Sequence, residues 1–141
     1  MSAIYTPAML ALSTELIRYP FDESFSHQAE ARSSVCGSAL RVGLNLDSEG
    51  RVIGIGLKVS ACAVGQSSAA ILAGAVQGAA REDISQTFDD IQRWLSGEGD
   101  QPQWPRFDTL AGARERPGRH GALRLPWEAA LAALSQDQLQ P

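Results

Sequence analysis

The stretch ALRVGLNLDSEGRVIGIGLKVSAC, residues 39–62, contains the pattern that decides the fold. Leucine or valine occupies every second position from Leu40 to Leu46, and β-type residues resume at Val52 after the polar segment DSEG. Such alternation is typical of a half-buried strand, and polar turn formers between two such runs favour a tight reversal of the chain. The sequence therefore predicts an antiparallel β-hairpin.

The two cysteines of the chain flank this hairpin. Cys36 precedes the first strand, and Cys62 follows the second strand, which is expected to run to Ala61. The outer ends of two hairpin strands lie at the same edge of a sheet, so the two thiols could meet there. In a reducing compartment such cysteines stay free or bind metal rather than form a disulfide.

Helical patterns are found on both sides of the hairpin. Small and apolar residues fill 61–80, which predicts a buried helix that begins near Cys62. The polar segment 21–34 is expected to be a loop leading into an exposed edge strand. A loop containing Pro117, Gly118 and Gly121 is expected before the last helix. The helices expected from these patterns span 6–18, 61–80, 83–95, 106–114 and 125–134.

Composition limits the class of protein. With 141 residues, 44% of them hydrophobic and 20% charged, the chain fits a single domain over 1–141. The net charge is −4 and the basic residues are scattered singly along the sequence, so no nucleic-acid partner is expected. No apolar run approaches the roughly 18 residues of a membrane helix, and the apolar stretch 9–17 lacks the features of a signal peptide. A soluble cytoplasmic protein without a membrane segment is expected.

Three loop segments contain the residues best able to carry chemistry. They read VCGS at 35–38, ACAVGQSSA at 61–69 and RPGRHGALRLPW at 116–127. Their order and spacing resemble the U-type iron–sulfur cluster scaffold family, which includes IscU, SufU and the N-terminal domain of NifU. The likeness is closest to the SufU-like branch and covers nearly the whole chain, including a Tyr-Thr-Pro-like start at 5–7. The residues that match the family's Pro-x-Arg and Leu-x-Trp ending are Pro117, Arg119, Leu125 and Trp127.

This resemblance implies an α+β fold, with a small antiparallel sheet of about three strands packed against about four to five helices. It also implies a scaffold rather than an enzyme. In the family, three cysteines and one aspartate bind zinc or a nascent 2Fe–2S cluster. The scaffold receives sulfur from a cysteine desulfurase and passes the cluster to recipient iron–sulfur proteins.

By position, Cys36 and Cys62 match the family's first and second ligands. Ser38 stands where the aspartate is expected, and Ala122 stands where the third cysteine is expected. His120 is a candidate replacement ligand because imidazole binds both zinc and iron.

Each of these residues also has a structural interpretation. Cys36 and Cys62 could be small, partly buried apolar side chains, and His120 could be a solvated loop residue. Two cysteines from each subunit of a homodimer would supply the ligands of one 2Fe–2S cluster. A zinc site made by Cys36, Cys62, His120 and water is a second option. The remaining alternative is a metal-free module that docks on the iron–sulfur assembly machinery.

Overall fold

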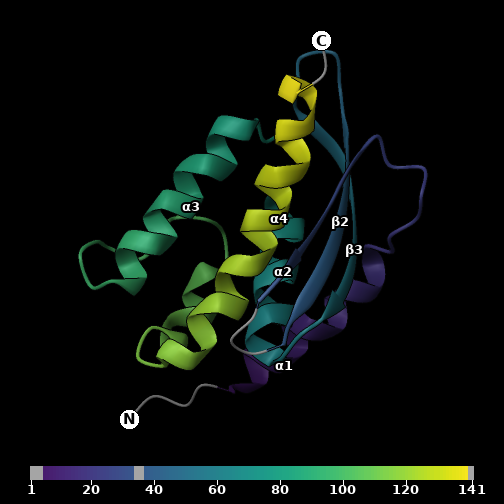
Figure 1. The fold of residues 1–141 in the computed structure, drawn as a ribbon. Helices are drawn as coiled ribbons and strands as arrows, with labels where there is room; N and C mark the ends of the chain where they lie inside the picture. The colour runs from purple at the N-terminus through teal and green to yellow at the C-terminus, as the bar shows by residue number, and fades with distance from the viewer. Residues whose placement is uncertain (1–4, 34–36, 140–141) are drawn as a thin grey trace.

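The computed structural model of the chain describes residues 5–33 and 37–139, with side chains described as far as residue 135. Within these ranges the backbone forms a three-stranded antiparallel sheet and a set of helices that cover one face of it (Figure 1). The α+β architecture expected from the sequence is confirmed.

The sheet contains the predicted hairpin and an edge strand. Its strands β1 (His27–Arg32), β2 (Ala39–Leu46) and β3 (Val52–Ser60) lie in the order β1-β2-β3. The reversal between β2 and β3 is closed by Asp47, whose Oδ1 accepts hydrogen bonds from the backbone N–H groups of Glu49 and Arg51, each at 2.9 Å. At the opposite end of the hairpin, Ala39 pairs with Ser60. The segments that connect these two residues to the candidate cysteines therefore start side by side at this end of the sheet.

The helical segments are α1 (Pro7–Thr14), η1 (Glu15–Arg18), α2 (Ala63–Ala75), α3 (Arg81–Leu95), η2 (Phe107–Ala113), η3 (Pro117–Arg119) and α4 (His120–Leu139). Helix α4 packs on β1 and β2, and α2 packs on β3 and on α4. Helix α1 lies against α2, while α3 lies against α4 on the side away from the sheet (Figure 1). Helix α1 begins at a side-chain cap, because the Thr6 hydroxyl accepts a hydrogen bond from the Met9 N–H at 3.1 Å.

Several predicted helix boundaries differ from the structure: the predicted helix 106–114 is the 3-10 helix η2, and α4 extends to Leu139 rather than ending at 134. Helix α2 ends at Ala75 rather than near residue 80, because Gly78 adopts a left-handed conformation (φ +88°). The Gly78 N–H then donates to the Val52 carbonyl at 2.7 Å, and the Val52 N–H donates to the Ala79 carbonyl at 2.9 Å. Helix α4 begins at His120 rather than at 125, so the predicted loop residue Gly121 lies inside it.

The core lies between the sheet and the helices. Val42 and Leu44 of β2, Ile71 and Leu72 of α2 and Trp127 of α4 are all almost completely buried. The small residues of α2 allow its backbone to lie close to α4, as expected for a helix that is apolar nearly all round. Among the residues described, no helix combines the length and apolar character that crossing a membrane requires.

The segment before β1 crosses the outer face of the sheet. The Phe25 ring lies directly over Gly43 and Gly56, which face each other on β2 and β3. Beside it, the Leu57 N–H at the outer edge of β3 donates to the Tyr19 carbonyl at 2.8 Å. This segment therefore covers the middle of the outer face and part of the β3 edge.

Candidate metal or cluster site

The turn between β1 and β2 contains the first candidate segment. The Ser33 N–H donates to the Ser38 carbonyl at 2.8 Å, and the Gly37 N–H donates to the Ser33 carbonyl at 3.1 Å. Gly37 has φ +71°, a conformation that favours glycine and allows the chain to turn back into β2. Cys36 lies outside the described residues, so its role as a ligand stays a prediction.

Cys62 lies at the junction of β3 and α2, where the sequence places it. It is the N-cap residue of α2, with φ −67° and ψ 173°, and its carbonyl accepts the Gln66 N–H at 3.0 Å. Its thiol is free and partly exposed, and its side chain also packs against the core. Its extended conformation is typical of an N-cap residue, and the helical conformation begins at the next residue, Ala63.

The first turn of α4 brings the third segment to the same end of the sheet. An ideal Cβ built on Gly65 of α2 would lie 3.4 Å from the Ala122 Cβ, so the first turn of α2 touches α4 here. An ideal Cβ on Gly121 would lie 3.0 Å from the Ser33 Oγ, so α4 also touches the β1–β2 turn. The turn that precedes β2, the start of α2 and the start of α4 therefore meet in one place.

The two positions that differ from the family pattern are buried within this cluster. Ala122 is completely buried and Ser38 is 3% exposed. At the position of the expected third cysteine, a methyl group packs against Gly65 instead of offering a thiolate. Ser38 contributes a neutral hydroxyl where a carboxylate is expected, and a neutral hydroxyl is a weak ligand for zinc or iron.

His120 is the first residue of α4 and is partly exposed. Its Nε2 lies 2.8 Å from the Arg114 carbonyl oxygen. Because a carbonyl only accepts hydrogen bonds, Nε2 carries the proton and donates, and Nδ1 is the nitrogen that could bind a metal. Metal-binding histidines commonly hold their second nitrogen by such a bond to a backbone carbonyl.

The donors that the structure describes do not complete a four-ligand site. In residues 5–33 and 37–135, no three His, Cys, Asp or Glu side chains are grouped so that they could share one metal ion. Of the predicted donors, Cys62 and His120 lie within these ranges, and Cys36 lies outside them. A metal held here would require Cys36, a second copy of the chain, or water to fill the remaining positions.

Sequence reasoning missed a buried hydroxyl that positions α4. The Ser68 Oγ donates to the Leu123 carbonyl at 2.6 Å and accepts from the Trp127 Nε1 at 3.0 Å. These two bonds fix α4 against α2 and so hold Ala122 beside Gly65. A serine pair inside an otherwise apolar helix was the available signal, because a buried hydroxyl needs a hydrogen-bond partner.

Comparison with known proteins identifies structures of similar fold. No family model and no curated protein sequence matches the chain. Among solved structures, the N-terminal part of a nitrogen-fixing NifU-like protein from Brucella abortus superposes with a TM-score of 0.88 at 26% identity, over 98% of this chain and 96% of that one. A protein assigned as the iron–sulfur cluster assembly scaffold of the SUF system in Fervidobacterium islandicum AW-1 superposes with a TM-score of 0.84 at 17% identity, over 93% of this chain and 96% of that one. The chain therefore has the fold of these NifU-like and SUF-system structures.

Proposed function

We propose that this protein is an iron–sulfur cluster scaffold or carrier with an incomplete ligand set, which holds a cluster or zinc through Cys36 and Cys62. The observation that carries the proposal is the meeting of three segments, the β1–β2 turn, the start of α2 and the start of α4, at one end of the sheet. In this proposal the whole chain, 1–141, acts as one NifU/IscU-like domain in the cytoplasm. It performs no catalysis of its own.

The cargo would be a 2Fe–2S cluster shared between two copies of the chain. One chain offers two thiolates, whereas a cluster of this type is held by a set of four, so two chains complete the set. Cys62 is suited to this role because its thiol is free and partly exposed at the start of a helix. The partners that this function implies are a cysteine desulfurase, which supplies sulfur, and a recipient iron–sulfur protein.

A zinc site within a single chain is a second candidate, and the bond between His120 and Arg114 favours it. The 2.8 Å hydrogen bond from Nε2 to the Arg114 carbonyl fixes the tautomer that leaves Nδ1 free for a metal. Cys36, Cys62, His120 and water would then form an open tetrahedral site.

A metal-free docking module is the third candidate, and the burial of Ala122 favours it. The third-ligand position is filled by a methyl group in contact with α2. In this case the fold would be kept as a surface for the assembly machinery after its metal chemistry was lost.

Anaerobic reconstitution of the full chain with iron and sulfide tests these candidates, with absorption and native mass as readouts. We expect about one cluster per dimer, and we expect the Cys36→Ser, Cys62→Ser double variant to lose both the cluster and the dimer. His120→Ala should keep the cluster dimer, and His27→Ala, at the only other histidine of the chain, is the matched control.

The other outcomes identify the other candidates. Metal analysis of the freshly purified protein tests the zinc site. About one zinc per chain, lost in His120→Ala and kept in His27→Ala, would replace the cluster proposal with the zinc site. The docking module would be supported by two results together. The parent protein would stay apo and monomeric, and the double cysteine variant would still support growth of cells that need the protein.

A further inference from the structure

A row of charged residues crosses the outer face of the sheet. Glu30 of β1 faces Arg41 of β2, and Arg41 in turn faces Lys58 of β3. Like charges placed directly opposite each other on neighbouring strands are destabilising. The Arg41–Lys58 pair therefore costs the sheet some stability.

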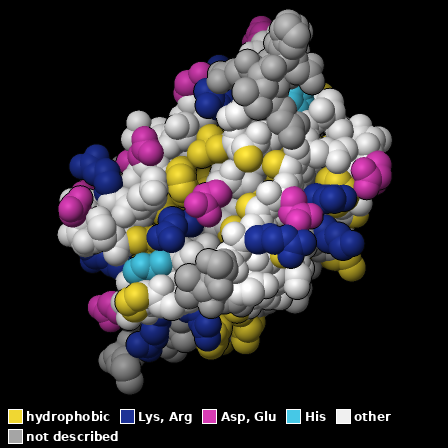
Figure 2. Space-filling model, in the orientation of Figure 1, with side chains coloured by type: hydrophobic (Ala, Val, Ile, Leu, Met, Phe, Trp, Pro, Cys, Tyr) yellow, Lys and Arg dark blue, Asp and Glu magenta, His cyan; other side chains and the backbone are white. Residues whose placement is uncertain are grey.

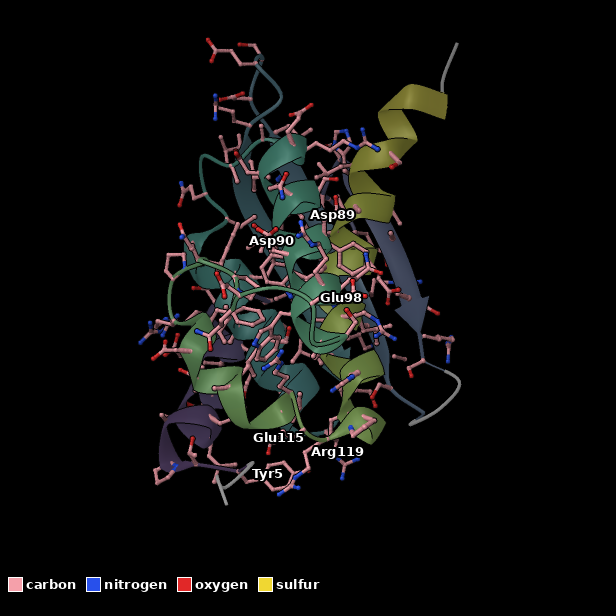
Figure 3. The ribbon with its side chains drawn as sticks, turned by 90° about the vertical axis from the view of Figure 1, so that its left-hand side faces the viewer. Tyr5, Asp89, Asp90, Glu98, Glu115 and Arg119 are labelled. Carbon is pink, nitrogen blue, oxygen red and sulfur yellow. The ribbon has the colours of Figure 1, made fainter. Side chains whose placement is uncertain are left out.

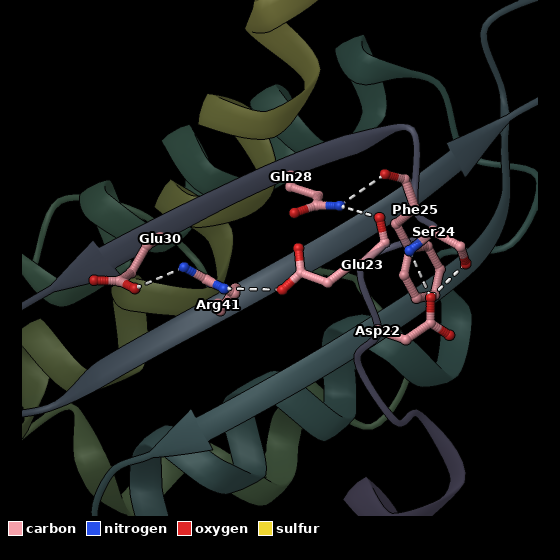
Figure 4. A network of polar contacts seen from close by, with 7 residues as sticks. All are labelled: Asp22, Glu23, Ser24, Phe25, Gln28, Glu30 and Arg41. Atoms are coloured by element: carbon pink, nitrogen blue, oxygen red, sulfur yellow. Dashed lines mark hydrogen bonds and ion pairs between the residues drawn. The ribbon is translucent and has the colours of Figure 1, made fainter.

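The carboxylates of this face do not neutralise the cations. Glu30 lies 2.9 Å from Arg32 and is shared with Arg41. Arg41 lies 3.6 Å from Glu30 and 3.5 Å from Glu23 (Figure 4). Lys58 is exposed and forms no ion pair with any residue in the described parts of the chain. An exposed ammonium group beside an arginine is thus left available to an external anion.

These side chains surround a hollow next to the candidate site. It has a volume of about 340 Å³ and is lined by Glu30, Arg32, Arg41 and Lys58 together with Ala39, Leu40, Val59 and Ser60. Three cations against one carboxylate give its lining a net charge of +2, in a chain whose net charge is −4. Figure 2 shows basic side chains gathered over the strands of this face, with acidic ones beside them. Ala39 and Ser60 are the last paired residues before the candidate-site loops.

We infer that this hollow docks a carboxylate-rich segment of a partner protein. Its geometry suits carboxylates, because Arg41 is held in place by the Phe21 ring, 5.6 Å from the guanidinium carbon, and still has 43% of its side chain exposed. A planar guanidinium held in this way can pair with a carboxylate, and the neighbouring ammonium adds a point charge. The basic lining is confined to this hollow in a chain of net charge −4, so a short acidic segment fits it better than an extended phosphate backbone.

The distribution of charge over the molecule supports the same partner. Asp89, Asp90 and Glu98 lie on the α3 side, away from the sheet (Figure 3). An acidic partner would be repelled there and attracted to the hollow, so the field of the chain would orient it. The inference involves no thiol, and it holds whether the neighbouring site carries a cluster or no metal.

Binding of a labelled oligoglutamate peptide to the full-length protein, followed by fluorescence anisotropy at low ionic strength, tests the inference. We expect saturable binding that weakens with added salt, whereas an oligoglutamine peptide should not bind. Lys58→Gln should weaken the binding by about threefold, as the loss of one exposed ion pair would, and Lys58→Glu should weaken it further. The matched controls are Arg93→Gln and Arg93→Glu on α3, which make the same changes in net charge and should leave the binding unchanged.

Two further readouts separate a local effect from misfolding. Lys58→Gln removes the repulsion from Arg41, so the variant should unfold at the same urea concentration as the parent or at a higher one. Lys58 is also the only lysine of the chain, so oligoglutamate should slow its modification by an amine-reactive reagent, as measured by mass spectrometry.

Three results would overturn the inference. The first is parent-like binding by Lys58→Glu, and the second is an equal loss in Arg93→Glu, which would indicate non-specific attraction. The third is tighter, Lys58-dependent binding of an oligothymidine, which would identify a nucleic-acid surface instead. Because binding should be the same in the Cys36→Ser, Cys62→Ser variant, failure here is distinct from failure of the cluster proposal.

Discussion

Ser68 shows how much of the site's geometry depends on one side chain. It is completely buried, and its hydroxyl donates to Leu123 and accepts from Trp127. We expect Ser68→Ala to lower the free energy of unfolding by about 1–3 kcal/mol, because the indole N–H would be left buried without a partner. Urea unfolding monitored by circular dichroism measures the change.

Ser13→Ala is the control for this prediction. Its hydroxyl also donates to a backbone carbonyl, that of Leu10 at 2.7 Å, but the bond is exposed to water. Water can replace an exposed bond, so the change in stability should stay within about 0.5 kcal/mol. Equal effects in Ser68→Ala and Ser13→Ala would mean that the buried bonds do not hold α4 in place.

Sequence alone predicts some of these residues better than others. Cys62 could be placed correctly because the hydrophobic period changes from that of a strand to that of a helix at this residue. The pattern of α2 could indicate that Ser68 needs a hydrogen-bond partner, but its partners could not be predicted because they lie 55 and 59 positions away. The tautomer of His120 likewise depends on a carbonyl that only the folded chain brings to it.

Gly43 of β2 and Gly56 of β3 lie against the Phe25 ring, which leaves no room for a larger side chain at either position. An ideal Cβ on Gly43 would lie 2.5 Å from the Phe25 ring, and one on Gly56 would lie 2.4 Å from the same ring and 2.6 Å from the Pro20 carbonyl oxygen. We expect Gly43→Ala to destabilise the protein by about 1–3 kcal/mol through overpacking. Gly56→Ala should cost more, because one of its contacts is with backbone.

Gly54→Ala is the matched control, because Gly54 lies on β3 together with Gly56. An ideal Cβ there lies 4.0 Å from the Phe25 ring, an ordinary contact. Because alanine also restricts the unfolded chain, Gly54→Ala should leave stability unchanged or raise it by about 0.4–1 kcal/mol. Thermal unfolding of the three variants compares them, and equal losses at Gly43 and Gly54 would exclude steric contact with Phe25 as the cause.

At the level of elements, the hairpin was predictable and the start of α4 was not. Alternating apolar residues and a polar turn are a local signal, and the structure confirms β2 and β3. Gly121 and Pro126 are typical helix breakers, yet both lie inside α4. Packing of α4 against α2, β1 and β2 outweighs their low helix propensity, and such tertiary contacts cannot be read from local sequence.

An ion pair between Glu15 and Arg106 connects segments that are far apart in the sequence. Arg106 donates to Glu15 through two nitrogens, at 2.9 and 3.1 Å, across 91 positions of sequence. Gly74 of α2 leaves room for this side chain, since an ideal Cβ there would lie 2.5 Å from the Arg106 Nη2. The pair therefore joins η1 to the start of η2 past the surface of α2.

This ion pair predicts a dependence of stability on pH. The hydrogen bond from Arg106 holds the pKa of Glu15 below its ordinary value of 4.5, against the opposing effect of burial. A lowered pKa in the folded state stabilises the protein above the ordinary value, and this stability is lost as the pH falls through the folded-state pKa. Glu15→Gln should thus cost up to about 1 kcal/mol at neutral pH and progressively less in acid.

Urea unfolding at a series of pH values measures this difference. Glu49→Gln, which removes an exposed carboxylate in the hairpin turn, is the control and should show no comparable pH-dependent loss. A cost of Glu15→Gln that is the same at neutral and acid pH would show that packing, rather than the charge, is responsible.

Charge distribution is a property of the whole molecule that composition did not reveal. The basic residues are scattered singly in the sequence, yet Arg32, Arg41 and Lys58 line one hollow. They meet because strand pairing places Arg41 opposite Lys58, while Arg32 lies in the neighbouring row of the same face, opposite Ala39. Surface electrostatics could therefore be predicted only after the register of the sheet was known.

The bond between Leu57 and Tyr19 has a consequence for symmetry. Because the Tyr19 carbonyl occupies the Leu57 N–H and Pro20 has no N–H to offer, the outer edge of β3 cannot pair there with the same strand of another copy. A two-fold dimer that shares a cluster would instead be joined at the end of the sheet where α2 begins. Its rotation axis would then pass through the cluster and make the Cys62 ligands of the two copies equivalent.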